Sequence, residues 1–505
     1  MIERMQRIGN NTICAAIIAL ACFLPEVGLF VDGDILPKWY LFGLGLCAII
    51  ITYARGRLKD DIKPYIKLML TAAASIVSIW AIAESAFNGW VAAHGPFDNP
   101  AGLAISLCCV MALNNGGTEG GMKNKWATIA MTTIMACAVI ASQSRCGIVA
   151  LMLISANNTI QSKRWFMGTV LVALFACGAI GLSTIKSAST SGRAFILQQT
   201  WEMVAEHPLA GWGTGGFERN YMLRQASFFD MHPDDPAATL ADDIRHPLCE
   251  YLLWWVNYGV AGLLAIILLL FYPVFKVQDK GLRLTCMLIC WFAVASYPLH
   301  YPLVWSMLIL SWVSIIWHKT VHILNKKTIK ATATTIAIIS SAGICLHAAS
   351  SFELNKAENA SLSHRHKKAL RIYKRLEQLQ QHDPYYLYAY SRECYTVGLF
   401  EDALYWNDCC RNFWSSYDLA LLRGDILFHL ERYTEAKQEY RLASNMCPSR
   451  FAPLEGLMNV YEVFGDGART KEMARTILLK PVKVPSGDVD RIKKRAETVI
   501  NGNQE

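Results

Sequence analysis

Three basic side chains stand out as groups that could do chemistry: Arg145, Arg193 and His246. An arginine guanidinium forms paired hydrogen bonds with phosphate oxygens, which an ammonium group cannot match. A histidine can accept a proton near neutral pH. Two of the three lie in a polar, glycine-rich stretch, residues 185–250, that interrupts a very apolar chain. We therefore treat this stretch as the place where a reaction would occur.

Arg193 opens a predicted amphipathic helix over residues 193–206, and Ser191 is a suitable N-cap for it. This position would put the guanidinium in the first helical turn, beside backbone N–H groups and the positive end of the helix dipole. Such a site suits phosphate. The alternative is an ordinary surface arginine. The predicted apolar face would pack on the membrane domain and consists of Phe195, Ile196, Met203 and Val204.

Arg145 lies in the segment SQSRCGIVAL, at the predicted outer end of two apolar runs. An arginine at a membrane boundary is costly unless its head group reaches water or meets an anion. Two interpretations therefore stand side by side. The residue is either a boundary anchor or an anion site that faces the outer leaflet.

His246 lies just before an apolar run that starts near Glu250. If this segment is helical, the two side chains share one face, because residues four apart are neighbours on a helix. His246 could then accept a proton from an acceptor hydroxyl. A lone histidine is more often structural, and His232 in the segment MHPDDP is a rival candidate for the base.

The glycine-rich segment GWGTGGF, residues 211–217, resembles a dinucleotide-binding loop only superficially. It follows a predicted helix and the tripeptide EHP, and no strand–helix unit surrounds it. Its glycines more plausibly let the chain fold tightly against the membrane domain.

The composition indicates a membrane protein. Of 505 residues, 53% are hydrophobic and only 17% are charged, whereas soluble domains carry about a quarter charged residues. The net charge of +8 is read first as an orientation signal and not as nucleic-acid binding. No Cys pair has zinc-ligand spacing with His, so no metal is predicted.

Runs of about 17 to 25 apolar residues are long enough to cross a bilayer. The chain offers about eleven candidates, so we predict an all-α, polytopic membrane protein. The first run is predicted to be a retained helix and not a signal peptide. The candidates are 12–30, 38–54, 68–84, 100–114, 126–142, 146–161, 166–184, 251–274, 284–299, 303–318 and 331–350.

One orientation satisfies nearly every short loop. If the N-terminus is cytoplasmic, the inner loops 55–67, 115–125, 162–165, 275–283 and 319–330 hold the Lys and Arg residues, whereas the outer loops hold almost none. Arg145, the stretch 185–250, His300 and all residues after Ser351 then lie on the periplasmic side. The short inner loops offer no phosphate cradle, which argues against a transferase fed by a cytosolic nucleotide sugar.

The chain divides into a membrane domain, residues 1–350, and a charged, amphipathic tail, residues 352–505. A helix is predicted from about Leu354 to Gln380. The segment LLRGDILFHLERYTEAKQEYRLASNMCP follows the tetratricopeptide pattern. The alternative is a plain helical bundle. In an oxidising compartment the tail cysteines could form a disulfide, with the pairing left open among Cys394, Cys409, Cys410 and Cys447.

Three repeats are predicted from residues spaced 32 or 33 apart. The central repeat has Gly424, Ala436 and Ala443 where paired helices touch, with Tyr433 and Tyr440 between them. The preceding copy places Ala403 at the equivalent of Ala436. The following copy places Gly456 and Ala468 at the equivalents of Gly424 and Ala436.

Taken together, these segments resemble the O-antigen ligase family of bacterial membrane glycosyltransferases, from about residue 12 to residue 349. The most specific match is SGRAFILQQTWEMVAEHPLAGWGTGGF, which is close to the family's G-R-x-x-x-W…P…G-x-G-x-x-F block. The other matching segments are GPFDNPAGLA, SQSRCGIVAL and HPLCEYLLWWVNYGVAGLL. Here Ala101 replaces an Asn of the family pattern, and His246 lies four residues before Glu250 instead of two.

The resemblance implies a glycan donor on undecaprenyl pyrophosphate and transfer to a hydroxyl without metal or cofactor. It implies that Arg145 and Arg193 bind the pyrophosphate and that His246 activates the acceptor. Asn99, Gly213 and Glu250 are further expected substrate-binding residues. The acceptor would be lipid A-core for a ligase, a Ser or Thr hydroxyl for a protein O-oligosaccharyltransferase, or a growing glycan for a polymerase. A non-enzymatic assembly anchor, with the tail recruiting a protein partner, is the remaining alternative.

Overall fold

The computed structural model describes residues 2–30, 32–33, 35–57, 62–115, 125–162, 187–324 and 327–502. Within these ranges every regular element is a helix and no strand is present, which confirms the all-α class. The chain forms two compact units. Unit 1 comprises residues 1–186, 248–251 and 264–352, and unit 2 comprises residues 187–247, 252–263 and 353–505.

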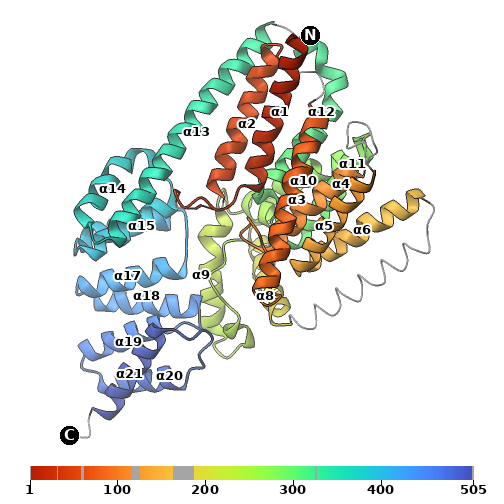
Figure 1. The fold of residues 1–505 in the computed structure, drawn as a ribbon. Coiled ribbons are helices and arrows are strands. Elements are labelled where there is room, and N and C mark those ends of the chain that lie inside the picture. The colour runs from red at the N-terminus through yellow and green to blue at the C-terminus, as the bar shows by residue number, and fades with distance from the viewer. Residues whose placement is uncertain are drawn as a thin grey trace. The chain divides into compact units, whose positions relative to one another are not determined.

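Unit 1 is a bundle of apolar helices (Figure 1). In chain order these are α1 (Ile2–Phe23), α2 (Leu36–Ala54), α3 (Lys63–Phe87), α4 (Pro100–Asn114), α5 (Lys125–Ala141), α6 (Arg145–Ser162), α11 (Lys280–Ala295), η2 (Pro298–His300) and α12 (Pro302–Leu324). Two longer helices, α10 (Glu250–Lys276) and α13 (Lys327–Leu362), contribute residues to both units.

Helix α4 is the centre of unit 1. Every residue from Gly102 to Leu113 is buried, and the helix packs against α3, α5, α6, α11 and α12. Its sequence, PAGLAISLCCVMALN, carries no charge and only one hydroxyl before its last residue, so it has no polar face to turn outward. A helix that is hydrophobic all round belongs in the interior of a bundle.

Ten of the eleven predicted spans fall on helices of the structure. The eleventh, 166–184, lies outside the described residues. Among the described residues, four helices are long and apolar enough to cross a membrane: α2, α3, α10 and α13. Other apolar helices, among them α4 and α5, are shorter. The protein is therefore a multi-pass membrane protein, and the count of eleven spans stays a prediction.

Unit 2 contains the polar stretch and the tail. The polar stretch forms α8 (Ser187–Glu206), α9 (Gly216–Met231) and the short η1 (Pro236–Thr239). The tail forms α14 (His366–Gln380), α15 (Pro384–Thr396), α16 (Phe400–Arg411), α17 (Tyr417–His429), α18 (Tyr433–Met446), α19 (Ala452–Val463), α20 (Gly467–Leu479) and α21 (Gly487–Asn501).

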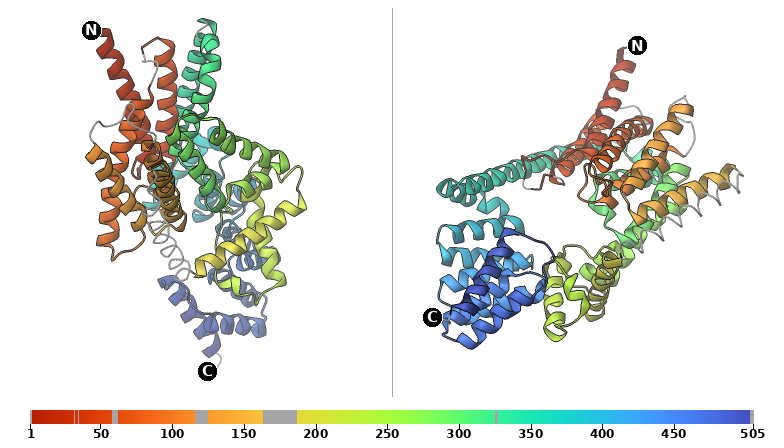
Figure 2. Two further views of the ribbon diagram at one scale, coloured as in Figure 1. Left: turned by 90° about the vertical axis from the view of Figure 1, so that its right-hand side faces the viewer. Right: turned by 60° about the horizontal axis from the view of Figure 1, so that its bottom comes forward.

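The tail helices pack as successive antiparallel pairs, α15 with α16, α17 with α18 and α19 with α20 (Figures 1 and 2). Tyr440 of α18 lies between two of these pairs. A Cβ added at Gly424 would lie 2.7 Å from its ring, and one added at Gly456 would lie 2.5 Å from it. The two glycines, 32 residues apart, thus make room for one tyrosine.

The third copy of the repeat is weaker than predicted. Ala436 and Ala443 are fully buried, but Ala468 is exposed. The reason is that α20 begins at Gly467, so Ala468 lies at the very start of its helix. Ala436 lies two residues further into its helix, because α18 begins at Tyr433. The assignment of the tail to the tetratricopeptide family stays a prediction.

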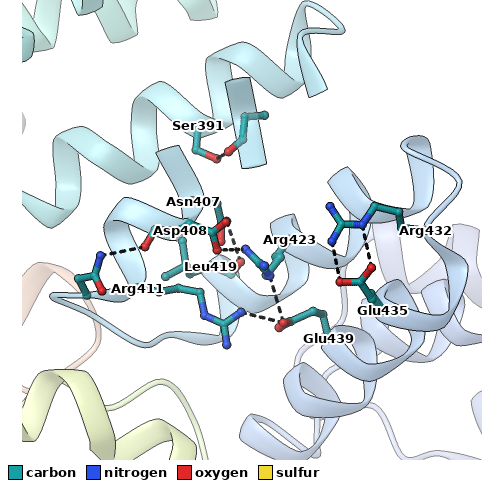
Figure 3. A network of polar contacts seen from close by, with 11 residues as sticks. Ser391, Asn407, Asp408, Arg411, Leu419, Arg423, Arg432, Glu435 and Glu439 are labelled. Atoms are coloured by element: carbon teal, nitrogen blue, oxygen red, sulfur yellow. Dashed lines mark hydrogen bonds and ion pairs between the residues drawn. The ribbon is translucent and has the colours of Figure 1, made fainter. Parts of the chain in front are cut away.

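A polar network joins α16, α17 and α18 (Figure 3). The guanidinium of Arg423, with a side chain only 13% exposed, pairs with Asp408 and, at 3.1 Å, with Glu439. Arg411 contacts the same Glu439 carboxylate at 2.7 Å. Shielded pairs of this kind are screened less than surface pairs, so the network fixes how successive helices are arranged.

Two predictions about the tail are wrong. The helix expected over 354–380 is two helices, α13 and α14, separated by a turn in which His364 has φ 56°. A left-handed residue of this kind ends a helix. Cys394, Cys409, Cys410 and Cys447 are all free, so the disulfide considered for them is not formed.

Replacement of Gly456 by Ala should lower the unfolding temperature of unit 2. The new methyl group would meet the buried Tyr440 ring at 2.5 Å, and such overpacking costs about 1–3 kcal/mol. Gly467→Ala is the matched control, because nothing lies within 4 Å of its Cβ position. Thermal unfolding of the purified full chain measures both. Equal unfolding temperatures for the two variants would contradict the packing described here.

Candidate functional site

The glycine-rich turn after α8 is held by backbone hydrogen bonds to a break in helix α10. We call this set of hydrogen bonds the lock. Gly259 interrupts α10 with φ 64° and ψ −157°. In an unbroken helix the Val256 carbonyl would accept from the Val260 N–H. Instead, Val256 O accepts from Trp212 N at 2.7 Å, and Val260 N donates to Pro208 O at 3.0 Å. The turn thus replaces the helical bonds that the break removes.

Two glycines make this close approach feasible. A Cβ at Gly259 would lie 2.0 Å from Leu209 O, and one at Gly211 would lie 2.5 Å from Gly259 N. Both residues also have positive φ, a conformation that side chains with a Cβ rarely adopt. Gly211 in the segment HPLAGWG and Gly259 in the segment NYGVAG are therefore needed because the two backbones are in direct contact here.

Asn257 extends the lock to helix α9. Its backbone oxygen accepts from Gly213 N at 2.9 Å, and its buried side-chain Oδ1 accepts from Phe217 N at 3.0 Å. The N-cap of α9 is Gly215, which has no side chain to satisfy the first N–H groups of the helix. The amide of Asn257 takes that role. The N–H of Gly213 thus forms a hydrogen bond within the protein, and substrate binding by Gly213 stays a prediction.

His246 borders a cavity of about 510 Å³ in unit 2, together with Glu218, Arg219 and Arg245. The remaining lining residues are Thr214, Gly215, Pro384, Tyr385, Asn412, Phe413 and Trp414. Arg219 is held in place by a hydrogen bond of 2.9 Å to the Trp212 oxygen. Glu218 is half-buried and its Oε2 is buried without a partner among the described residues. Burial raises the pKa of Glu218 above its usual value.

The prediction that His246 and Glu250 share a helical face is wrong. Helix α10 begins at Glu250, so His246 precedes it in irregular structure. Pro247 disfavours a helical conformation for the residue before it, and Leu248 has φ 57°. Glu250 is buried and its Oε1 accepts from Leu299 N at 3.0 Å. This carboxylate thus binds backbone within unit 1.

The rival base, His232, is exposed at the end of α9. Its Nδ1 lies 3.1 Å from the Phe228 oxygen, and its ring stacks on Phe228 with centroids 4.7 Å apart. His232 is not among the residues that line the cavity. The surroundings of His246 are therefore better suited to proton transfer than those of His232.

Arg193 does not open its helix. Helix α8 starts at Ser187, so Arg193 lies in the second turn and Ser191 is inside the helix. The predicted receptor of a guanidinium beside a helix N-terminus is not formed there. Helix propensity and capping preferences are weak signals, and the run SAST continues the helix. Phe195 packs on Phe229 and Ala241 within unit 2.

A guanidinium beside a helix N-terminus is found instead at Arg145, the first residue of α6. Ser142 and Ser144 shape the preceding turn. Ser142 Oγ accepts from Ser144 N, and Ser144 Oγ accepts from Gly147 N, both at 3.3 Å. Arg145 is half-buried and lies beside the positive end of the α6 dipole, which favours anions.

Asn99 is held by a polar cluster in unit 1. Its Oδ1 caps α4 by accepting from Gly102 N at 2.8 Å, and its Nδ2 lies 2.8 Å from the Tyr301 hydroxyl. Tyr301 and Tyr297 in turn donate to Asp98 at 2.7 and 3.1 Å. The motif GPFDNPAG thus builds the start of the buried helix α4, and a substrate contact of Asn99 stays a prediction.

The expected site residues are divided between the two units. Arg145, Asn99 and Glu250 belong to unit 1, whereas Arg193, Gly213 and His246 belong to unit 2. Sequence reasoning missed the cavity residues Glu218, Arg219 and Arg245. Only Arg245 carried a signal, its position next to His246. The tail residues of the cavity could not be paired with the polar stretch, because more than 130 positions separate them.

Comparison with known families supports the predicted resemblance. The family described as O-Antigen ligase matches residues 130–267, a segment that contains Arg145, Arg193, Gly213, His246 and Glu250. This segment is therefore similar to the O-antigen ligase family, and the match does not cover the regions on either side of it. No curated protein was found to match the chain.

The lock predicts that Gly259→Ala opens the turn. Positive φ costs a residue with a Cβ about 1–2 kcal/mol, and the methyl group would also displace Leu209 O. We expect a lower unfolding temperature and new protease cleavage within residues 207–216. Gly343→Ala is the control, since its Cβ would meet nothing within 4 Å. A Gly259→Ala protein with the protease resistance of the wild type would refute the lock.

Asp243 gives a prediction of pH dependence. Burial raises the pKa of this carboxyl to about 6, although Arg245 acts in the opposite direction. The folded state therefore binds the proton more tightly than the unfolded chain, whose pKa is near 3.8. This contribution to stability is complete below that lower value and is lost as pH rises through about 6.

Asp243→Asn removes this ionisation. The unfolding temperature of the variant, relative to that of the wild type, should rise between pH 4.5 and pH 7.5, measured by differential scanning fluorimetry. Asp488→Asn, at a carboxylate that is 89% exposed, serves as the control. A difference that stays constant with pH for Asp243→Asn would contradict the assignment.

Proposed function

We propose that the protein transfers a glycan from undecaprenyl pyrophosphate to an acceptor hydroxyl at the periplasmic face of a bacterial inner membrane, as an O-antigen ligase-like enzyme. One observation carries the proposal. His246, within the segment that matches the O-antigen ligase family, borders a cavity that also contains Glu218, Arg219 and Arg245. A proton acceptor at a preformed polar cavity is what the activation of a hydroxyl requires.

The reaction is a substitution at the anomeric carbon of the donor sugar. The acceptor oxygen forms a bond to that carbon while the bond from carbon to the pyrophosphate oxygen breaks. The electron pair of the broken bond stays with the pyrophosphate, and the hydroxyl proton passes to the imidazole of His246. Neither redox chemistry nor a cofactor enters this scheme, and charge is handled by protein side chains.

Arg145 and Arg193 are assigned to the pyrophosphate. Negative charge grows on the leaving group as the bond breaks, so guanidinium hydrogen bonds are stronger in the transition state than in the ground state. Arg145 is supported further by its position in the first turn of α6. Arg193 is supported by its place in the segment that matches the family.

Lipid A-core is the acceptor that a ligase would use, and it is our leading assignment. A protein hydroxyl and a growing glycan are the alternatives within the same chemistry. The tail, which we assign to the periplasm as a tetratricopeptide-like repeat domain, favours an acceptor or partner that is a protein, because stacked helical repeats present peptide-binding surfaces. A purely structural anchor would not need the cavity at His246.

His246→Ala and Arg193→Ala should each abolish glycan transfer by the full-length protein while leaving membrane insertion and unfolding temperature unchanged. Loss of a general base lowers rates by about 10²–10⁴-fold. Arg193→Lys should restore only part of the activity, since an ammonium cannot form the paired bonds of a guanidinium. His232→Ala is the matched control and should remain active. Normal transfer by His246→Ala would rule out the assigned base.

Surface glycans from cells with and without the gene test the function as a whole. Loss of long-chain lipopolysaccharide with accumulation of undecaprenyl-linked glycan supports the ligase. Loss of sugar from glycoproteins identifies a protein acceptor, and collapse to single repeat units identifies a polymerase. If no band changes, the proposed transfer is wrong and the anchor becomes the better interpretation.

A further inference from the structure

One strongly basic segment of the tail has no part in the proposed reaction. Residues 359–376 hold six Lys or Arg residues and no Asp or Glu. The rest of the tail differs, because residues 377–505 hold 19 acidic and 16 basic side chains. Positive charge is therefore concentrated in one place. The six basic residues are all exposed and are Arg365, Lys367, Lys368, Arg371, Lys374 and Arg375.

Neither membrane orientation nor pairing within the protein explains this charge. Under the predicted topology the residues after Ser351 lie on the outer side of the membrane, whereas Lys and Arg are favoured on the inner side. In the part of the chain that the structure describes, Arg375 pairs with the Glu353 carboxylate, and none of the other five basic side chains forms an ion pair. Their charge is therefore not neutralised there by the protein itself.

Three of the basic residues form a stripe along α14. The opposite face of this helix packs against α15, where Tyr373 stacks on Tyr390 with ring centroids 5.2 Å apart. The buried residues of α14 are Ala369, Ile372, Tyr373, Leu376 and Gln380. At 3.6 residues per turn, Lys367, Arg371 and Lys374 lie about half a turn round the helix from that face. We call these three residues the basic stripe, and it faces away from the neighbouring tail helix.

The ion pair of Arg375 relates α14 to the end of a helix that can cross a membrane, α13. The predicted apolar run of α13 ends at Ser350, and Glu353 follows three residues later in the same helix, about 4.5 Å further along it. The chain turns at His364, and α14 then brings Arg375 to Glu353. Lipid headgroups occupy about 5–8 Å beyond the hydrocarbon core on each side. Lys374, next to Arg375, therefore lies within reach of the headgroups.

The other residues of the basic stripe follow within two helical turns. Arg371 and Lys367 precede Lys374 by three and seven residues, which is at most about 4.5 and 10 Å along the helix. The attraction between basic side chains and an anionic membrane surface falls off within a Debye length, about 8 Å at physiological salt. Long Lys and Arg side chains add reach. Lys374 and Arg371 should therefore contribute most to such an attraction, and Lys367 less.

We propose that the basic stripe of α14 docks the tail on the headgroups of anionic phospholipids in the membrane that α13 crosses. Lys and Arg side chains donate charge-assisted hydrogen bonds to phosphate oxygens. Clusters of basic residues on an amphipathic helix beside a membrane span bind anionic lipid in this way. The contact keeps the tail at the bilayer surface. It involves neither the glycan donor nor the acceptor, so it is independent of the proposed function.

Photo-crosslinking of the full-length protein tests the proposal. Gln378→p-benzoylphenylalanine puts a photoreactive group at an exposed position of α14, one turn after Lys374. The protein is placed in nanodiscs of equimolar phosphatidylglycerol, which is anionic, and phosphatidylcholine, which has no net charge. After irradiation, lipid adducts are identified by mass spectrometry. Leu346→p-benzoylphenylalanine is the positive control for lipid contact, because Leu346 is 64% exposed within the apolar run of α13.

Two sets of charge variants, each combined with Gln378→p-benzoylphenylalanine, test whether charge causes the contact. Each basic residue near an anionic surface gives about a fivefold preference, so adducts of the unaltered stripe should favour phosphatidylglycerol at least about tenfold. The stripe variant should lose most of this preference, and the control variant, with the same change in charge at exposed tail positions, should keep it. Thermal unfolding checks that both variants remain folded. The stripe variant combines Lys367→Gln, Arg371→Gln and Lys374→Gln, and the control variant combines Arg475→Gln, Lys483→Gln and Lys494→Gln.

Each outcome decides the proposal. Adducts enriched in phosphatidylglycerol that lose the enrichment in the stripe variant but not in the control variant support it. Adducts without preference for either lipid, or the same preference in both charge variants, overturn the recognition of anionic headgroups by the stripe. Lipid adducts at position 346 but none at position 378 overturn the docking itself. None of these results bears on glycan transfer, which is measured separately.

Discussion

The backbone exchange between the glycine-rich turn and the broken helix α10 is the constraint on which the polar stretch depends. Buried peptide groups must be hydrogen-bonded, most strictly in a helix apolar enough to cross a membrane. The break at Gly259 removes a helical bond, and Trp212 N and Pro208 O supply the replacements. Opening the turn would leave these groups unsatisfied. The turn is therefore fixed by the need to hydrogen-bond buried backbone N–H and C=O groups, which also keeps a membrane helix intact.

The same hydrogen bonds also fix the residues of α9 that line the cavity. Asn257, next to the break, holds both Gly213 N and Phe217 N, so the start of α9 is fixed in direction. Glu218 and Arg219 follow in the first turn of α9 and line the cavity. On the other side, Gln225 of α9 binds the Met446 oxygen of the tail. Helix α9 thus binds both the broken helix α10 and the tail. These contacts fix both sides of the cavity that His246 borders.

The helices were predictable because apolar length alone marks a helix in a membrane protein, and ten predicted spans coincide with helices. The site was predictable only in part. The motifs pointed to Arg145, Arg193 and His246, but the local structure around Arg193 and His246 was not read correctly. Pro247 and Leu248 keep His246 out of the helix, and α8 begins six residues before Arg193. The tail wall of the cavity depends on contacts across more than 130 positions, which no local pattern encodes.

The charges around Arg145 and around the cavity at His246 suit different parts of the proposed reaction. A pyrophosphate leaving group needs hydrogen-bond donors, and Arg145 lies at the positive end of α6, which favours anions. The cavity at His246 is different, because the Glu218 carboxylate lies among its donors and would repel a phosphate. A neutral hydroxyl compound gains from both Glu218 and the arginines, since it can donate and accept. The proposed roles, with the cavity taking the acceptor and Arg145 the donor, rest on this difference in charge.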